Sequence, residues 1–329
     1  MADKNGAASN SERNLILALS GGVGGAKLVL GLSKMVAADD LTIIANTADD
    51  FNHLGLSICP DLDTVMYTLA GLNDQQQGWG LANESWNTMD ALAELGGDTW
   101  FRLGDRDLAT HLERSLRLSQ GQGLAAVTQY LCERLGVKHK LLPMSDQAVR
   151  TKIKTISGEL AFQEYFVRDQ CAPAISGLYF EGLDQAVPHP ELMAILASER
   201  LAAIIICPSN PFVSVDPILK LDGVGEAMRN SAAPVVAVSP IVAGMAIKGP
   251  AAKMMAELNM PVTALAVAAH YGDLLDGFII DKSDQHLAPA IAQLDIKVCC
   301  VPTVMKTLED RLNLARDVLA FAGTLSGSL

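Results

Sequence analysis

Short, uninterrupted runs of apolar residues recur along this chain, and they limit its possible folds more than any other feature. The runs have the length of β-strands and lie at residues 15–19, 41–45, 203–207, 235–238, 278–280 and 298–301. Several are continuous rather than alternating, a pattern typical of strands that are covered on both faces. Because helical patterns separate them, the sequence predicts an α/β fold with a mostly parallel sheet flanked by helices.

Amphipathic helical spacing marks the segments between these runs. The predicted helices lie at residues 26–35, 61–70, 107–118, 124–135, 190–198, 250–258 and 307–322. In the helix at 107–118 we expect a broad apolar face made of Leu108, Leu112, Leu116 and Leu118. We expect Arg114 of that helix to point outward with its other charged residues.

A change of pattern marks one internal region. Between residues 141 and 181 the segments become short and alternating, as in LAFQEYFV at 160–167. Alternation favours antiparallel strands, so we predict a small inserted α+β subdomain here. The rest of 14–323 is predicted to form one domain, with a disordered polar lead-in at 1–13 and a frayed tail at 324–329.

The overall charge and the apolar content exclude two classes of function. The formal net charge is −12, whereas a nucleic-acid-binding surface needs a basic stripe against the phosphates. No stretch approaches the roughly 20 uninterrupted apolar residues of a membrane-spanning helix. Residues 1–14 lack the basic-then-apolar order of a signal peptide, so we expect a cytoplasmic protein. The six cysteines show no C-x-x-C spacing and are expected to be free thiols.

A glycine-rich turn, SGGVGGAKL at 20–28, follows the first predicted strand. It is neither a P-loop, which needs glycine before the lysine, nor a dinucleotide fingerprint, whose third glycine is replaced by a lysine. It keeps the Rossmann-like order of strand, glycine turn and helix N-terminus, which binds anions. The predicted phosphate-binding residues are Gly21, Gly22, Gly24, Gly25 and Lys27. The alternative is a tight turn that binds nothing.

Acidic residues follow the second predicted strand in the segment NTADDF. Asn46, Asp49 and Asp50 lie beyond the carboxyl end of that strand, where open α/β sheets bind ligands. Adjacent carboxylates suit Mg²⁺, although Asn and Asp also form ordinary turns. Further on, Asp61 is expected to cap the helix that follows, and Asp63 is either a third acid of the site or compensation of the helix dipole.

Four later segments offer further candidate contacts. Trp79 lies between two glycines and suits stacking on a flat ring or core packing, and Arg106 could meet a phosphate or pair with a neighbouring aspartate. The proline-rich loop after residue 207 presents Ser209 and Asn210 on a stiff frame. Lys248 reaches the same sheet edge if the strands at 203–207 and 235–238 are neighbours. The six histidines show no metal-binding spacing.

Taken together, these motifs resemble the phospholactate transferase family of coenzyme F-420 biosynthesis. The segments that carry the resemblance are SGGVGGAKL, NTADDF, LGLSICPDLDTVMYTLAG, GWG, RLGDRDLATH, LLPMSD, CPSNPFVSVDPIL, VSPIVAGMAIKGPAAKMM and VPTVM. The resemblance as a whole extends from about residue 14 to residue 322. One departure is the sequence GGVGG, where GGTGG is expected.

The resemblance implies a Mg²⁺-dependent transferase. It would move a phosphorylated three-carbon acid from its guanosine diphosphate ester to the ribityl hydroxyl of the deazaflavin Fo and release GMP. Phospholactate, phosphoenolpyruvate and phosphoglycerate all stay open as the acid. A homodimer is also implied.

The same resemblance assigns roles to the candidate residues. Asp49, Asp50 and Asp63 would hold Mg²⁺ or orient the alcohol, with Asp49 and Asp50 the catalytic pair. Trp79 would lie near the deazaflavin. The remaining polar contacts, to nucleotide and phosphate, would come from Ser209, Asn210 and Lys248.

Two other functions compete with this one. The first is a non-enzymatic regulator of the gluconeogenesis-factor type, which binds nucleotide sugars, but such proteins are expected to have a glycine- and serine-rich stretch after the acids, where this chain reads DDFNHLGL. The second is a nicotinamide dehydrogenase. It requires an acid at the end of the second strand, where Asn46 stands.

Overall fold

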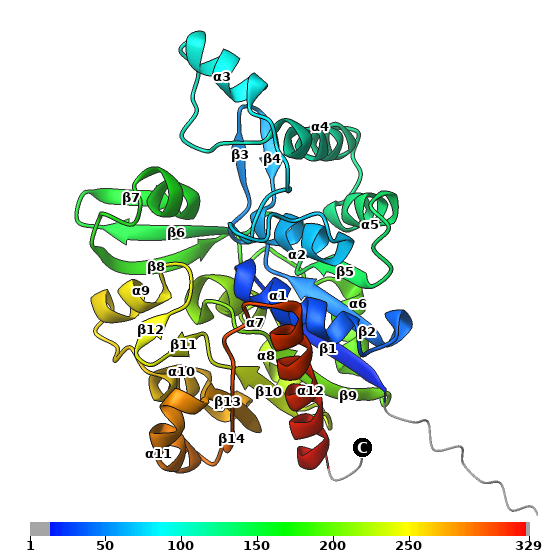
Figure 1. Cartoon of the computed structure of the whole chain (residues 1–329), viewed down its shortest axis with the longest axis vertical. Coiled ribbons are helices and arrows are strands. Elements are labelled where there is room, and N and C mark those ends of the chain that lie inside the picture. The colour runs from blue at the N-terminus through cyan, green and yellow to red at the C-terminus, as the bar shows by residue number, and fades with distance from the viewer. Residues whose placement is uncertain (1–13, 327–329) are drawn as a thin grey trace, which may run out of the picture.

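A parallel sheet of seven strands forms the centre of the computed structural model, which describes residues 14–326 (Figure 1). The strand order is β14-β13-β10-β9-β1-β2-β5. The strands are β1 (Leu15–Ser20), β2 (Leu41–Ala45), β5 (Lys140–Pro143), β9 (Leu201–Ile206), β10 (Val235–Val238), β13 (Gly277–Asp281) and β14 (Lys297–Val301). All pairs in this sheet are parallel, which confirms the predicted fold class.

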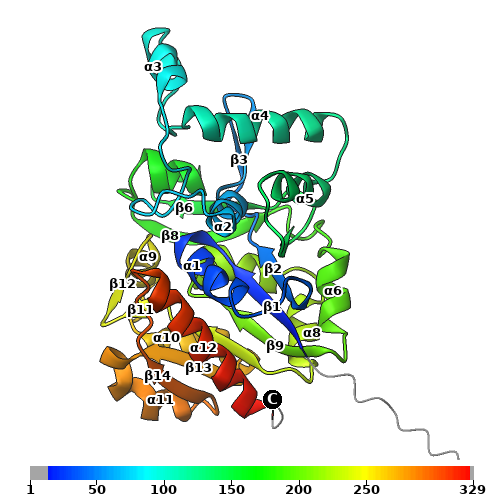
Figure 2. The same cartoon turned by 45° about the vertical axis from the view of Figure 1, so that its right-hand side comes forward.

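Helices cover both faces of the sheet, as Figures 1 and 2 show. The helices are α1 (Gly22–Ser33), α2 (Pro60–Ala70), α3 (Asn87–Glu94), α4 (Asp105–Ser119), α5 (Leu124–Arg134), α6 (Pro190–Leu196), α7 (Asp216–Leu219), α8 (Val224–Arg229), α9 (Ala251–Glu257), α10 (Ala264–Tyr271), α11 (Ala288–Ala292) and α12 (Leu308–Leu325). Side chains of one strand alternate between two cores. Leu17 and Leu19 of β1 pack in the core with α6 to α11, and Ile16 and Ala18 pack with α1, α2, α5 and α12. This double burial explains the uninterrupted apolar runs.

The chain changes direction across the sheet next to β1. It passes from β1 to β2 and β5 on one side, then returns to β9 on the other side of β1. The chain therefore leaves β1 and β9 toward opposite sides of the sheet, and open α/β sheets bind ligands at the carboxyl ends of the strands where the order reverses in this way. The residues that follow these strands are Gly21 and Cys207. This edge is where the fold places a ligand.

The predicted insertion starts too early. Residues 141–143 belong to β5, an edge strand of the main sheet, which was missed because only Leu141 and Leu142 are apolar within it. A separate antiparallel sheet, β7-β6-β8, consists of β6 (Arg150–Thr155), β7 (Gly158–Ala161) and β8 (Ile175–Glu181). The alternation predicted through residue 167 is also wrong, since Glu164–Arg168 forms a short π-helical turn.

The apolar face predicted for the helix at 107–118 is confirmed for Leu108 and Leu118, which pack against apolar clusters, and is wrong for its other two leucines. Leu112 and Leu116 of α4 are 54% and 52% exposed, whereas Arg114 is only 1% exposed. Helical periodicity predicts the face with more leucines to be buried. Instead, the face with Arg114 is buried, because Arg114 forms a buried ion pair that is described below.

Smaller elements complete the fold. Two short hairpins pair β3 (Phe51–His53) with β4 (Leu56–Ile58) and β11 (Ile241–Val242) with β12 (Met245–Ala246). The predicted tail at 324–329 begins inside α12, which continues to Leu325. The lead-in at 1–13 and residues 327–329 lie outside the described residues. All six cysteines are free thiols. Within 14–326, no helix combines the length and the apolar character needed to cross a membrane.

Candidate functional site

A cavity of about 500 Å³ opens at the carboxyl edge of the sheet. Its walls come from residues that follow five of the parallel strands: Gly21 after β1, Asp49 after β2, Ser209 after β9, Ser239 after β10 and Thr303 after β14. Helix α2 and the first turn of α4 close one side. The cavity therefore occupies the crevice predicted from the strand order.

The glycine turn packs tightly against the loop after β9. The backbone N–H of Gly21 donates to Oγ of Ser209 at 3.0 Å, and that hydroxyl donates to the carbonyl oxygen of Gly21 at 2.8 Å. A Cβ at Gly24 would overlap the carbonyl oxygen of Pro208, and one at Gly25 would lie 2.8 Å from Oγ of Ser209. The glycines are thus required by close backbone approach, and α1 begins within the turn, four residues before the predicted start.

Asp61 is a site residue that the sequence did not reveal. Its Oδ1 accepts from the backbone N–H of Gly22 at 2.7 Å, and its Oδ2 accepts from Nδ2 of Asn46 at 3.0 Å. It makes no capping hydrogen bond to its own helix, so the predicted cap is wrong. Burial is the main reason that the pKa of Asp61 rises to about 6. The carboxylate lies at the positive end of α1, where an anion is favourable.

Asp49 lies on the cavity wall beside this group. Its Oδ1 accepts from Oγ1 of Thr151 at 3.0 Å. Burial, and next the negative charge of Asp61, raise the pKa of Asp49 well above its ordinary value. The two carboxylates therefore form a buried acidic pair that a cation would stabilise.

Asp50 takes a different position. Among the described residues it is not one of those that line the cavity. Its Oδ1 is buried without a hydrogen-bond partner, and burial raises its pKa to about 7. The catalytic role predicted for Asp50 stays a prediction.

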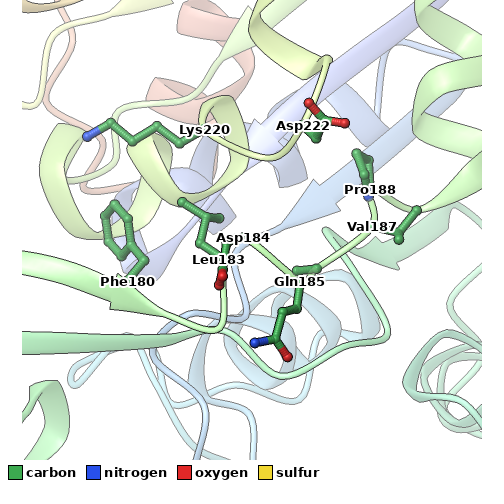
Figure 3. A pocket seen from close by; sticks show the side chains of 9 residues that line it. Phe180, Leu183, Asp184, Gln185, Val187, Pro188, Lys220 and Asp222 are labelled. Carbon is green, nitrogen blue, oxygen red and sulfur yellow. The ribbon is translucent and has the colours of Figure 1, made fainter.

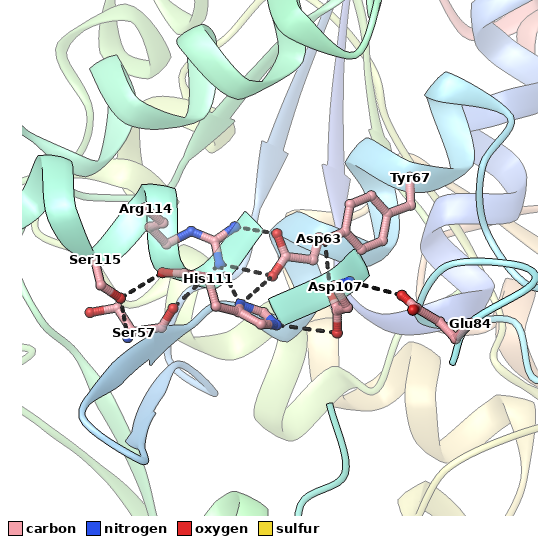
Figure 4. Close-up of polar contacts among 8 residues, drawn as sticks. All are labelled: Ser57, Asp63, Tyr67, Glu84, Asp107, His111, Arg114 and Ser115. Atoms are coloured by element: carbon pink, nitrogen blue, oxygen red, sulfur yellow. Dashed lines mark hydrogen bonds and ion pairs between the residues drawn. The ribbon is translucent and has the colours of Figure 1, made fainter. Parts of the chain in front are cut away.

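Asp63 belongs to a buried polar network on the α4 side of the cavity (Figure 4). Both of its carboxylate oxygens pair with Arg114, Oδ2 with Nη1 at 3.0 Å and Oδ1 with Nη2. Arg114 also donates to the carbonyl oxygen of Ser57. Because its two oxygens are already paired with a guanidinium, we do not propose Asp63 as a metal ligand.

Three more residues of this network reach the cavity wall: Tyr67, Asp107 and His111. Tyr67 donates its hydroxyl to Oδ1 of Asp107 at 2.6 Å. Nε2 of His111 lies 3.2 Å from Oδ2 of Asp107, and its Nδ1 lies 3.1 Å from Nη1 of Arg114. None of them was predicted, because their spacing in the sequence matches no metal or catalytic motif.

Basic and aromatic residues also border the cavity. Lys27 donates to the carbonyl oxygen of Met305 at 2.9 Å, and burial followed by the charges of Arg311 and Lys248 lowers its pKa. Lys248 donates to the carbonyl oxygen of Gln77 at 2.6 Å, beside Trp79. Trp79 is 46% exposed and lines the cavity. Three predicted contacts, Lys27, Lys248 and Trp79, are thus brought to one cavity.

Asn210 and Arg106, two further predicted ligand contacts, already make hydrogen bonds within the protein. Asn210 lines the cavity, but its Oδ1 accepts from the backbone N–H of Phe212 at 3.0 Å and so caps its own loop. Arg106 is outside the cavity lining. Its Nη1 donates to the carbonyl oxygen of Ala82 at 2.7 Å, and the predicted phosphate contact stays a prediction.

The fit of a metal ion depends on Asp49 and Asp61. Within residues 14–326, no three side chains of His, Cys, Asp or Glu form a ready-made metal site. Mg²⁺ needs no such cage, since it commonly binds one or two carboxylates together with substrate phosphates and water. A buried acidic pair beside an anion-binding helix N-terminus fits that requirement.

A second hollow lies between the turn after β8 and the loop after α7 (Figure 3). It measures about 630 Å³ and includes Phe180, Asp184 and Lys220. Lys220 already pairs with Asp216 at 2.7 Å and lies over the ring of Phe180. Because the only cation of its lining within residues 14–326, Lys220, is already paired, we assign this hollow no function.

Comparison with known proteins agrees with this geometry. A family described as 2-phospho-L-lactate transferase CofD matches residues 16–299. The phosphoenolpyruvate transferase of Kitasatospora aureofaciens is 42% identical over 93% of this chain and 97% of its own length. The 2-phospho-L-lactate transferase of Methanosarcina mazei is 36% identical over 92% and 99%.

A solved structure supports the fold. A UPF0052-family protein from Bacillus halodurans superposes with a TM-score of 0.60 over 94% of this chain and 99% of its own, at 14% identity. At that identity the similarity concerns the fold alone. The match over most of the sequence carries the assignment, and this chain belongs to the CofD family of transferases.

Proposed function

We propose that this protein transfers a phosphorylated three-carbon acid from its guanosine diphosphate ester to the ribityl hydroxyl of Fo, with release of GMP. The observation that carries the proposal is the meeting of the glycine turn, the buried acidic pair and the Ser209 loop in one cavity at the point where the strand order reverses. Membership of the CofD family supports the same reaction.

The donor is anionic, and we place its phosphates between the start of α1 and Lys27. The positive end of α1 and the ammonium group of Lys27 both favour negative charge. Lys27 is held toward the cavity by its bond to Met305. The Ser209 hydroxyl fixes the backbone of Gly21 and keeps this anion-binding surface rigid.

Asp49 and Asp61 are the residues we propose to hold Mg²⁺, together with donor phosphate oxygens. When bound, the ion would neutralise negative charge that develops on the phosphates. The raised pKa values of both carboxylates support the proposal, since each gains from a nearby cation.

The transfer itself is a substitution at phosphorus. The hydroxyl oxygen of Fo bonds to the phosphorus that carries the acid, and the bond from that phosphorus to the bridging oxygen of GMP breaks. The hydroxyl proton must leave in the same step. Asp49 is the acceptor we propose, because it lines the cavity and a carboxylate can accept a proton on the oxygen that does not face the ion. Positioning and charge neutralisation supply the remaining catalysis.

Phosphoenolpyruvate is the acid that we propose. The support comes from identity, which is 42% to the phosphoenolpyruvate transferase and 36% to the 2-phospho-L-lactate transferase given above. The acids differ by a methyl, a methylene or a hydroxyl-bearing carbon, and pocket contacts of this size discriminate about 10- to 200-fold.

A direct assay tests the whole proposal. Purified protein is incubated with Fo, Mg²⁺ and each of the three guanosine diphosphate esters separately, and the products are identified by mass spectrometry. We expect an acid-bearing Fo adduct and GMP in equal amounts, fastest with the phosphoenolpyruvate ester. No adduct from any donor, with protein that still binds nucleotide, would refute transfer and favour a regulatory nucleotide-binding role.

We also propose a cytoplasmic homodimer, on the ground of the family resemblance. Light scattering of the purified protein at micromolar concentration tests the assembly. A molar mass of one chain across that range would exclude a stable dimer.

A further inference from the structure

Asp107 is a carboxylate on the cavity wall that has no role in the reaction proposed above. Its side chain is 14% exposed, it lies on the first turn of α4, and it contacts Tyr67. Ile58 and Phe101 line the same cavity and give it apolar surface. Lys27 and the start of α1 also line it, so the walls of the cavity differ in charge and polarity.

The charge of Asp107 indicates which substrate meets it. Burial raises its pKa, but the contacts with His111 and Tyr67 outweigh burial and hold the pKa below the ordinary value. The group is therefore ionised at neutral pH. A carboxylate repels the diphosphate and carboxylate of the donor and attracts O–H and N–H donors. The acceptor has such donors on its ribityl chain and its ring.

His111 lies beside this carboxylate, and Arg114 determines which of its ring nitrogens carries the hydrogen. A guanidinium has only hydrogen-bond donors, so the 3.1 Å contact between Nη1 of Arg114 and Nδ1 of His111 requires Nδ1 to be the acceptor. The imidazole hydrogen must then be on Nε2, which lies 3.2 Å from Oδ2 of Asp107. Asp63, paired with both nitrogens, fixes the guanidinium in turn (Figure 4).

We propose that Asp107 binds a hydroxyl or ring N–H donor of the acceptor, and that Arg114 is a positioning residue that keeps His111 in its Nε2-protonated form. The inference deepens the proposed function and rests on it. Tyr67 completes the arrangement from the α2 side, since its hydroxyl donates to Oδ1 of Asp107 at 2.6 Å. One helix, α2, thus carries both Asp61, which contacts the start of α1, and Asp63, which pairs with Arg114.

Binding of Fo without any donor tests the role of Asp107. Asp107→Asn keeps the shape and the contacts with Tyr67 but removes the charge, and Fo affinity in equilibrium dialysis is expected to fall about 10- to 100-fold, as for a lost charged hydrogen bond. The KM of the donor ester should stay within about twofold. Glu113→Gln is the matched control on α4, because Glu113 pairs with Arg117 outside the cavity lining.

The outcomes separate this inference from the function beneath it. Wild-type affinity for Fo in Asp107→Asn, with a wild-type protein that binds Fo and turns over, overturns the inference alone. A wild-type protein that does not bind Fo overturns the proposed acceptor and the inference together. Equal weakening of Fo and donor would show a general structural defect and would also overturn it.

The positioning role has its own measurement. Long-range ¹H–¹⁵N spectra of the imidazole report which nitrogen of His111 carries the hydrogen, and we expect Nε2 in the wild type. Arg114→Lys should allow the other form and weaken Fo binding. Because that variant could fold poorly, His111→Gln and His111→Leu provide a second test. Glutamine offers an N–H near the position of Nε2 and should retain Fo binding at least about tenfold better than leucine. Equal affinities in these two variants would refute positioning.

Discussion

The backbone N–H of Gly22 donates to Oδ1 of Asp61 over 2.7 Å, and so joins the first turn of α1 to the first turn of α2. The contact places the carboxylate of Asp61 at the N-terminus of α1, next to the cavity. Burial raises the pKa of Asp61 to about 6, so an empty site holds this charge at some cost near neutral pH. Binding of a cation between Asp61 and a phosphate would offset that cost.

We predict that Asp61→Asn abolishes the stabilisation of the protein by Mg²⁺. Asparagine can still accept from Gly22, but it lacks the charge, so affinity for Mg²⁺ should fall at least about 10- to 100-fold. In metal-free buffer at pH 8, the variant should melt at or above the wild-type temperature, because an ionised buried acid is removed. Thermal unfolding with and without Mg²⁺ in the presence of GDP is the measurement.

The control for this experiment is Asp273→Asn, an exposed carboxylate that does not line the cavity. It should keep the Mg²⁺-dependent rise in melting temperature. A rise of wild-type size in Asp61→Asn would remove Asp61 from the metal site.

We predict that Gly24→Ala damages the site through the backbone. The added Cβ would overlap the carbonyl oxygen of Pro208, so the loop that carries Ser209 must move. We expect a loss of about 1–3 kcal/mol in the free energy of unfolding and a raised KM for the donor. Gly177→Ala is the control, since its Cβ would meet nothing closer than 4.0 Å. Equal effects of the two substitutions would contradict the packing argument.

The sequence could predict the sheet because its strands are buried on both faces. The runs at 41–45 and 235–238 coincide with β2 and β10, residue for residue. β5 was missed because an edge strand with an exposed lysine and a terminal proline has little of that apolar signal. Residues that follow strand ends, such as Gly21, Asp49 and Ser209, could be placed at one edge because parallel strands bring their carboxyl ends together.

Contacts between distant helices could not be predicted in this way. Periodicity counts apolar residues, so it predicted Leu112 to be buried and Arg114 to be exposed, and both are reversed. A buried ion pair with Asp63, 51 residues away, has no local signature. The same holds for Asp61, whose partners Gly22 and Asn46 come from two other loops. These long-range polar pairs make up much of the site.

We predict that Asp50→Asn stabilises the protein more strongly as the pH rises. The folded-state pKa of Asp50 is about 7, and that of the unfolded chain is about 4. Between these values the folded protein holds a proton that the unfolded chain has released, so stability falls as the pH rises from about 4 to 7. The variant should match the wild type near pH 4 and exceed it at pH 8.

Denaturant unfolding of the wild type and the variant in metal-free buffer at both pH values provides the check. If the difference in their free energies of unfolding does not change with pH, the pKa of Asp50 is not raised by burial. Turnover of the same variant tests the separate prediction that Asp50 is catalytic. We expect reduced turnover without unfolding, and wild-type rates would remove Asp50 from the mechanism.

We predict that Lys27→Met separates stability from function. Burial lowers the pKa of Lys27, and the charges of Arg311 and Lys248 lower it further. In the absence of a ligand, its ammonium group therefore destabilises the folded protein. Replacement by methionine should leave the melting temperature unchanged or higher, while the KM of the anionic donor rises at least about tenfold, as for a lost charged hydrogen bond. Lys34→Met, at the exposed end of the same helix, should change neither. A destabilised Lys27→Met with normal donor KM would mean that this lysine serves the fold and not the donor.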